Sequence, residues 1–181
     1  IAMITTLIEL GADLEIRDNY NNTALLAASR RGEEDRILPL IEHGADVNAH
    51  GEDGDTALIL AAKTWNPEVI ASLLAHGANI NDRNTSDNTA LMVAASKSEN
   101  LECLNILLEY GADVSLRNDD GLTALEIAVH KGHGDAVETL EHHQQLLTHL
   151  PVFIQAKFVN GEAIELTDSY AFKEYQSINN K

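Results

Sequence analysis

The sequence repeats itself with a period of 33 or 34 residues. The tripeptide Thr-Ala-Leu and the dipeptide Gly-Ala each recur with spacings of 33, 33 and 34 residues. The tripeptides begin at Thr23, Thr56, Thr89 and Thr123, and the dipeptides at Gly11, Gly44, Gly77 and Gly111. Each Gly precedes the next Thr by 12 residues. Because two markers keep one register over more than 100 residues, the chain is an array of similar units.

Each unit is predicted to contain two short helices. The Thr opens an Ala- and Leu-rich segment such as TALILAAKTW, and its side chain suits an N-cap. A second apolar segment such as EVIASLLAHGA follows, and its Gly suits a left-handed C-cap. Residues that tolerate positive φ lie two positions before each Thr, so a tight, hairpin-like turn is expected there. They are Asn21, Gly54, Asp87 and Gly121. The extra residue of the longest spacing is most simply placed at 98–100.

These features resemble the ankyrin repeat. The period, the Thr-x-Leu helix start and the sequence Gly-Ala-Asp-Val-Asn at 44–48 are similar to that family, and the similarity covers residues 1 to about 143. The Thr-Ala-Leu variant is similar to many bacterial ankyrin proteins. Ala replaces the usual Pro in every copy, and four other residues replace the usual His: Leu26, Ile59, Met92 and Glu126. Since the family's His bonds between loops, its loss predicts less rigidly tied hairpins.

The resemblance implies an all-α ankyrin-repeat solenoid of stacked helix-turn-helix units with hairpin loops. A C-terminal capping helix, continuing through QQLLTHL to Pro151, and a short extension complete it. The expected domains are a partial repeat at 1–16 (second helix only), repeats at 17–50, 51–83 and 84–117, a C-terminal repeat with its capping helix at 118–150, and an aromatic-containing extension at 151–181.

Three residues depart from a simple repeat. Trp65 replaces the Gly between two helices, and it either anchors a partner or covers the core. Pro39 lies inside a second helix, where it removes an amide donor and could bend the helix. Cys103 falls on the predicted buried face of another second helix, so we expect it in the core.

The two ends of the chain differ from the repeats. Counted back from Gly11, Ile1 starts a second helix. We therefore expect a fragment that lacks upstream repeats, with an apolar edge of Met3, Ile4 and Leu7 that could self-associate. At the other end, Asn160-Gly161 fits a hairpin turn, but the spacing of Leu150, Ile154 and Phe158 fits a helix. Both alternatives stay open for the extension.

Composition excludes several classes of protein. The net charge of −17 repels nucleic acid and anionic lipid, and no run of 18 apolar residues predicts a membrane span. A single cysteine excludes a disulfide framework and disfavours a cysteine zinc cluster. It also favours an intracellular protein, as does the lack of a secretion signal in this sequence. His142, His143 and His149 lie close in sequence, but adjacent histidines point to different faces of a helix, so no metal is expected.

No motif of catalysis is present. The sequence has no P-loop, no Gly-x-Gly-x-x-Gly after a strand, no nucleophile elbow and no zinc-protease helix. We therefore predict a protein that is not an enzyme, with no catalytic residues and no cofactor.

The basic residues fall into two columns of the repeat register. One column precedes the hairpin turns, and the other ends the first helices. The resemblance implies a concave surface of hairpins and first helices, so these columns would line a cationic groove rimmed by acid. The alternative is that they serve solubility alone. Together with the aromatic candidates Tyr20 and Trp65, the predicted partner-binding residues are Arg17, Tyr20, Arg30, Arg31, His50, Lys63, Trp65, Arg83, Lys97, Arg117, His130 and Lys131.

The predicted function is therefore protein–protein interaction without catalysis. The partner would be another protein, or an acidic surface or peptide, bound on the concave face. The alternative is a regulatory or substrate-targeting domain of a larger enzyme or of a secreted bacterial effector.

Overall fold

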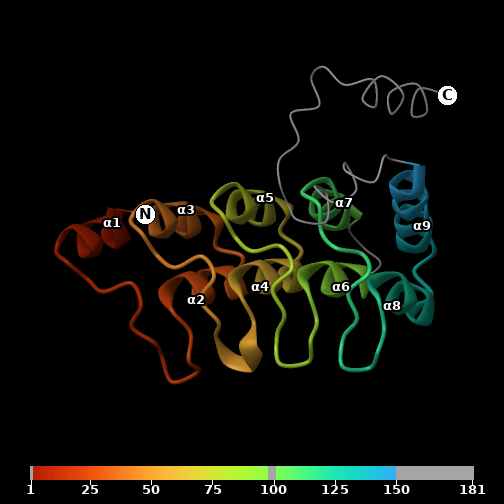
Figure 1. The fold of residues 1–181 in the computed structure, drawn as a ribbon. Coiled ribbons are helices and arrows are strands. Elements are labelled where there is room, and N and C mark those ends of the chain that lie inside the picture. The colour runs from red at the N-terminus through yellow and green to blue at the C-terminus, as the bar shows by residue number, and fades with distance from the viewer. Residues whose placement is uncertain (1, 98–100, 150–181) are drawn as a thin grey trace, which may run out of the picture.

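The computed structural model describes residues 2–97 and 101–149, which form helices and loops without a strand (Figure 1). The first helices of the repeats are α2 (Ala24–Arg31), α4 (Ala57–Thr64), α6 (Ala90–Ala95) and α8 (Ala124–Lys131). The second helices are α1 (Ala2–Glu9), α3 (Glu34–Glu42), α5 (Pro67–Ala75), α7 (Leu101–Glu109) and α9 (Gly134–His149). A short 3₁₀ turn, η1 (Glu52–Gly54), forms one hairpin tip.

The helices form two rows (Figure 1). In one row α2, α4, α6 and α8 pack on one another in order, and in the other α1, α3, α5, α7 and α9 do so. The hairpins project from the first-helix row. This arrangement confirms the predicted all-α solenoid of stacked helix-turn-helix units.

The threonines start the first helices as predicted. In each case the Thr hydroxyl accepts a hydrogen bond of 3.3–3.4 Å from the backbone N–H three residues later. The predicted turn positions all have positive φ, between 55° and 73°. Those residues are Asn21, Gly54, Asp87 and Gly121.

Trp65 occupies a position that other repeats give to glycine. Gly32 and Gly132 end α2 and α8 in the left-handed region, and Trp65 ends α4 with φ 57°. That conformation costs a residue with a side chain about 1–2 kcal/mol. The indole packs half-buried against the core, with the Lys97 ammonium 5.6 Å from the ring centre. Of the two predicted roles, the structure therefore supports covering the core.

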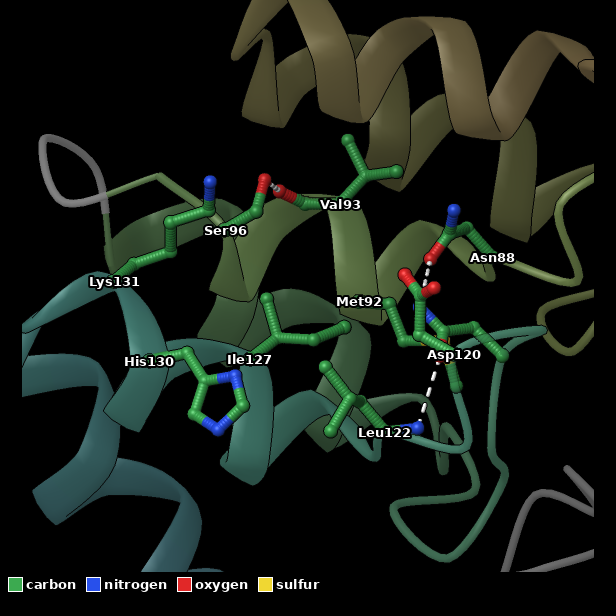
Figure 2. Close-up of a pocket in the computed structure, with 10 residues that line it drawn as sticks. Asn88, Met92, Val93, Ser96, Asp120, Leu122, Ile127, His130 and Lys131 are labelled. Carbon is green, nitrogen blue, oxygen red and sulfur yellow. Dashed lines mark hydrogen bonds between the residues drawn. The ribbon is translucent and has the colours of Figure 1, made fainter.

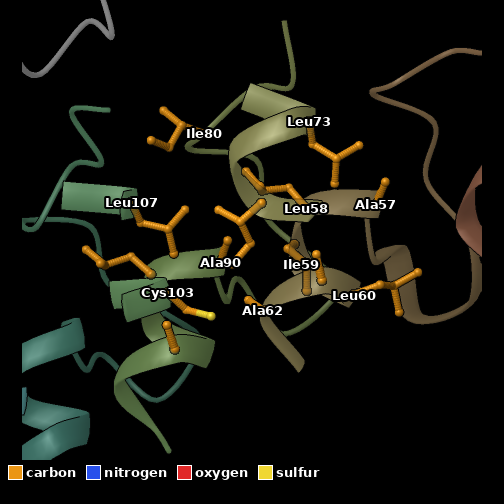
Figure 3. Close-up of a cluster of buried hydrophobic side chains, with 14 of the residues drawn as sticks. Ala57, Leu58, Ile59, Leu60, Ala62, Leu73, Ile80, Ala90, Cys103 and Leu107 are labelled. Atoms are coloured by element: carbon orange, nitrogen blue, oxygen red, sulfur yellow. The ribbon is translucent and has the colours of Figure 1, made fainter. Parts of the chain in front are cut away.

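One continuous hydrophobic core runs through the stack (Figure 3). Small residues of the first helices, such as Ala61 and Ala128, are fully buried and let neighbouring repeats approach closely. Leucines of the second helices, such as Leu73 and Leu107, fill the space between the rows. Cys103 lies in this core, as predicted, and burial raises the pKa of its thiol to about 11.

Two second helices differ from a simple repeat: α3 contains a proline, and α9 is longer than the others. α3 continues through Pro39, whose carbonyl oxygen lies 2.7 Å from the His43 Nδ1 in a hydrogen bond. α9 runs to His149, so the predicted long final helix is confirmed. The alternatives for the extension at 151–181 and the extra residue at 98–100 lie outside the described residues, as do the side chains of Met3 and Ile4.

Candidate binding surface

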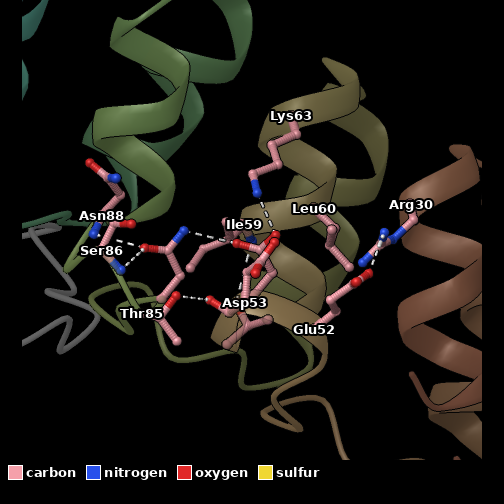
Figure 4. Close-up of polar contacts among 12 residues, drawn as sticks. Arg30, Glu52, Asp53, Ile59, Leu60, Lys63, Thr85, Ser86 and Asn88 are labelled. Carbon is pink, nitrogen blue, oxygen red and sulfur yellow. Dashed lines mark hydrogen bonds and ion pairs between the residues drawn. The ribbon is translucent and has the colours of Figure 1, made fainter. Parts of the chain in front are cut away.

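The inner face of the solenoid is where the first helices meet the hairpins (Figure 4). Two cations at the ends of first helices reach back to hairpin carboxylates. Arg30 pairs with Glu52 at 3.3 Å, and Lys63 pairs with Asp55. The Asp55 side chain is only 3% exposed, and it also accepts a 2.9 Å hydrogen bond from Asn84 Nδ2. These predicted binding residues therefore lie on the inner face, but the protein's own acids neutralise them.

The arginine column before the hairpin turns binds backbone carbonyls. Arg17 donates to the carbonyls of Asn21 in its own hairpin and His50 in the next. Arg83 donates to the Arg117 carbonyl of the next hairpin at 3.2 Å and pairs with Asp87. Arg117 itself donates to the Gly121 carbonyl and pairs with Glu126 at 2.9 Å. Arg17 and Arg83 therefore join successive hairpins, whereas the bonds of Arg117 stay within its own repeat.

Polar side chains form a second series of links between hairpins. Asn48 Oδ1 accepts from the Asn79 N–H at 2.8 Å, and Asn81 Oδ1 accepts from the Asp113 N–H at 2.9 Å. Further links join Asn118 Nδ2 to Asn88 Oδ1 and the Asp46 N–H to Glu15 Oε1. These bonds link successive repeats without the family's His, and the expectation of less rigidly tied hairpins stays a prediction.

A pocket of about 360 Å³ opens on the inner face between α6 and α8 (Figure 2). Its apolar lining comes from both helices and from the last hairpin: Met92, Val93, Leu122 and Ile127. His130 and Lys131 lie on one side of this lining, and Asp120 lies on the opposite side with Asn88 (Figure 2). Ser96 and Asn118 complete the wall. The pocket thus combines an apolar floor with groups of opposite charge on its two sides.

Two basic residues at the end of α8 line the pocket. Both His130 and Lys131 are exposed, and within the described part of the chain neither forms an ion pair. Arg30 and Lys63 hold the register position of His130 in α2 and α4 and are paired. Arg31 holds the position of Lys131 in α2 and, like Lys131, forms no ion pair in the described residues. His130 and Lys131 are distinguished from the other unpaired basic residues, Arg31 and Lys97, because they line the pocket.

The remaining predicted residues lie apart from the pocket. Tyr20 is exposed on the first hairpin, and Arg31 is exposed at the end of α2. Lys97 lies over the Trp65 ring. The apolar lining residues were missed by the sequence analysis because their register positions are those of ordinary core residues. Met92 and Ile127 are themselves buried, so the sequence carries no signal that sets them apart from other core residues.

The described residues contain no group of three His, Cys, Asp or Glu side chains placed to hold a metal ion. His143 is half-buried on α9, and burial lowers the pKa of its imidazole below the usual 6.5. In the ranges the structure covers, no helix has the length and apolarity to cross a membrane.

Stacked helix pairs with projecting hairpins define a helical-repeat solenoid, a class whose units contact only their neighbours. Two family models match the chain: ankyrin repeats (3 copies) at residues 1–84 and ankyrin repeats (many copies) at residues 73–128. The chain therefore belongs to the ankyrin-repeat family, whose repeats are generally protein–protein interaction modules and typically non-catalytic. A search of curated proteins finds no match.

Proposed function

We propose that this chain binds a partner protein in the inner groove, at the pocket between α6 and α8. The observation that carries the proposal is the apolar lining of that pocket beside His130 and Lys131, neither of which pairs with an acid in the described residues. An apolar floor with a few polar groups is typical of a binding site. Arg30, Lys63, Arg83 and Arg117 already pair with acids of the chain, so they have less to offer a ligand.

The chemistry of the pocket supports a particular kind of segment in the partner. An aliphatic or aromatic side chain would fill the space beside Met92 and Ile127. A carboxylate next to it would meet His130 and Lys131. On the opposite side, the Asp120 carboxylate would accept hydrogen bonds from backbone N–H groups of the partner, and the Asn88 carboxamide would donate to its backbone carbonyls. The preferred ligand is an extended acidic peptide with an apolar side chain next to its acid.

The experiment is selection from a random-peptide display library on the full chain, followed by titration of the enriched peptides. We expect enrichment of sequences in which an apolar residue neighbours Asp or Glu. The double substitution H130E/K131E should weaken their binding at least about tenfold, because it replaces two attractive contacts with repulsive ones.

The matched control is R36E. Arg36 is an exposed cation that pairs with Glu33 on α3, outside the pocket. Binding should survive this substitution within about twofold. Enriched peptides that bind H130E/K131E and the unchanged chain equally would refute the proposed site.

A further inference from the structure

The exposed end of α8 departs from the pattern of the earlier first helices. Ser29 in α2, Ala62 in α4 and Ala95 in α6 share one register position, six residues after the capping Thr, and each is 0% exposed. Val129 takes this position in α8 and is 55% exposed. The three small residues are buried where successive first helices pack, but in the described residues no further first helix packs on α8. An apolar side chain larger than its equivalents is thus left facing outward.

At a neighbouring position, α8 carries a charged residue where the earlier first helices carry an apolar one. Leu26, Ile59 and Met92 are buried at the position three residues after the Thr, whereas α8 carries Glu126. The Glu126 carboxylate accepts from the Thr123 N–H at 2.7 Å and pairs with Arg117. The backbone N–H of Thr123 is the main reason why the pKa of Glu126 is lowered. This face therefore combines a satisfied carboxylate with an uncovered apolar patch, and it lacks the small residues that admit another repeat of the same kind.

The apolar patch extends beyond one side chain. The leucines two residues after the Thr are 1% exposed in α2, α4 and α6, whereas Leu125 in α8 is only half-buried. We define the end face of the solenoid as Leu125, Glu126 and Val129. The exposed apolar side chains of this face would be stabilised by an apolar cover. Such a cover can lie farther from α8 than a helix that packs on alanine.

We propose that residues 151–181 of this same chain cover the end face and act as its cap. This segment contains five of the eight aromatic residues of the chain: Phe153, Phe158, Tyr170, Phe172 and Tyr175. It also carries three Lys against four acidic residues, so of the net charge of −17 it holds only −1. The acidic repeats therefore repel this segment little. Its aromatic side chains supply apolar surface that can cover Val129 and Leu125.

The connection has the required length. α9 packs beside α8 and contains 16 residues, so it extends about 24 Å from start to end. A return over that distance needs about seven or eight residues in extended conformation. Phe158 lies nine residues after His149, the last residue of α9. Because the segment is covalently attached, its effective concentration at the end face is high, which favours it over a free molecule.

The test is amide hydrogen exchange on the full chain with two kinds of variant. One is V129D, which places a charge on the end face. The other replaces the five aromatic residues of the segment with Ser (F153S, F158S, Y170S, F172S and Y175S). Each variant should exchange the α8 amides about tenfold faster, and the combination should exchange them no faster than either alone, because both changes remove the same contact. The amides of α2 should not change, since repeats are coupled mainly to neighbours.

The control is L38D, which places the same charge on another exposed apolar residue, in α3. It should leave the exchange of α8 unchanged. If V129D has the same effect with and without the five aromatic residues, or if the Ser variant leaves α8 unchanged, the proposed cap is refuted. If protection of α8 instead rises with protein concentration, a second copy of the chain covers the end face and the proposal also fails.

Discussion

Asp55 is the only buried carboxylate among the described residues. Its two partners, Lys63 from α4 and Asn84 from the next hairpin, come from different repeats. A buried carboxylate is tolerated only with such partners, since removing one leaves a charge without its compensating bond. This single residue therefore joins a first helix to two hairpins.

We predict that K63M lowers the free energy of unfolding by about 1–3 kcal/mol, because Asp55 keeps only the Asn84 bond. Urea denaturation followed by circular dichroism would measure the change. The matched control is R36M, which breaks the exposed pair of Arg36 and Glu33 and should cost less than about 0.5–1 kcal/mol. Equal costs for the two substitutions would contradict the special role of Asp55.

Sequence alone predicted the columns of cations but not what the cations do. Arg17, Arg83 and Arg117 recur at one register position, and recurrence is equally compatible with partner binding and with links between hairpins. For Arg17 and Arg83 the outcome depends on carbonyl groups that are 33 or 34 residues away, and their approach follows from stacking. His130 and Lys131, like Arg31 and Lys97, form no ion pair within the described residues.

At the scale of elements, α9 is the longest described helix, and it carries the half-buried imidazole of His143, whose pKa is lowered. Burial favours the neutral form of His143, and the nearby His142 adds to this preference. The folded protein therefore resists protonation at His143 more than the unfolded chain does. The helix is consequently expected to be sensitive to mild acid.

The sign of the pH dependence follows from the lowered pKa. The stability contributed by neutral His143 is fully present above the unfolded value of about 6.5 and is lost as the pH falls through that value toward the lower folded pKa. We predict that the urea midpoint falls between about pH 7.5 and pH 5.5, and that H143Q reduces this fall. The control H142Q changes an exposed neighbour and should keep most of the fall. An identical fall in all three proteins would disprove the prediction.

Most elements could be predicted because their signals are local. A Thr at the N-cap and a residue tolerant of positive φ two positions earlier act within a few residues, and all four copies behave alike. The pocket between α6 and α8 could not be predicted in this way. It depends on which side chains two successive repeats leave uncovered, and no single repeat contains that information. The role of Trp65 also depended on the fold, since either predicted role is compatible with its position in the sequence.

At the scale of the whole molecule, the position of a repeat in the stack decides what its residues contribute. Leu73 and Leu7 occupy the same register position in α5 and α1. Leu73 is 0% exposed, whereas Leu7 is 51% exposed because no first helix of its own repeat packs beside α1 in the described structure. The same side chain is therefore core in one repeat and surface in another.

We predict that L73A lowers the free energy of unfolding by about 2–5 kcal/mol, because it leaves a cavity in the centre of the stack. L7A should cost less than about 1 kcal/mol, since its side chain is already half in water. Urea denaturation of both variants measures the difference. A cost for L7A as large as that for L73A would mean that α1 is covered in solution, by another copy or by another segment.

The burial of Cys103 gives the chain a practical property. It is the only cysteine, and with a pKa near 11 it carries almost no thiolate at neutral pH. Alkylating dyes should therefore not react with Cys103, and they should modify only a cysteine introduced at the surface. A fluorophore attached through D120C would lie at the mouth of the groove, where its emission would report the arrival of a ligand directly.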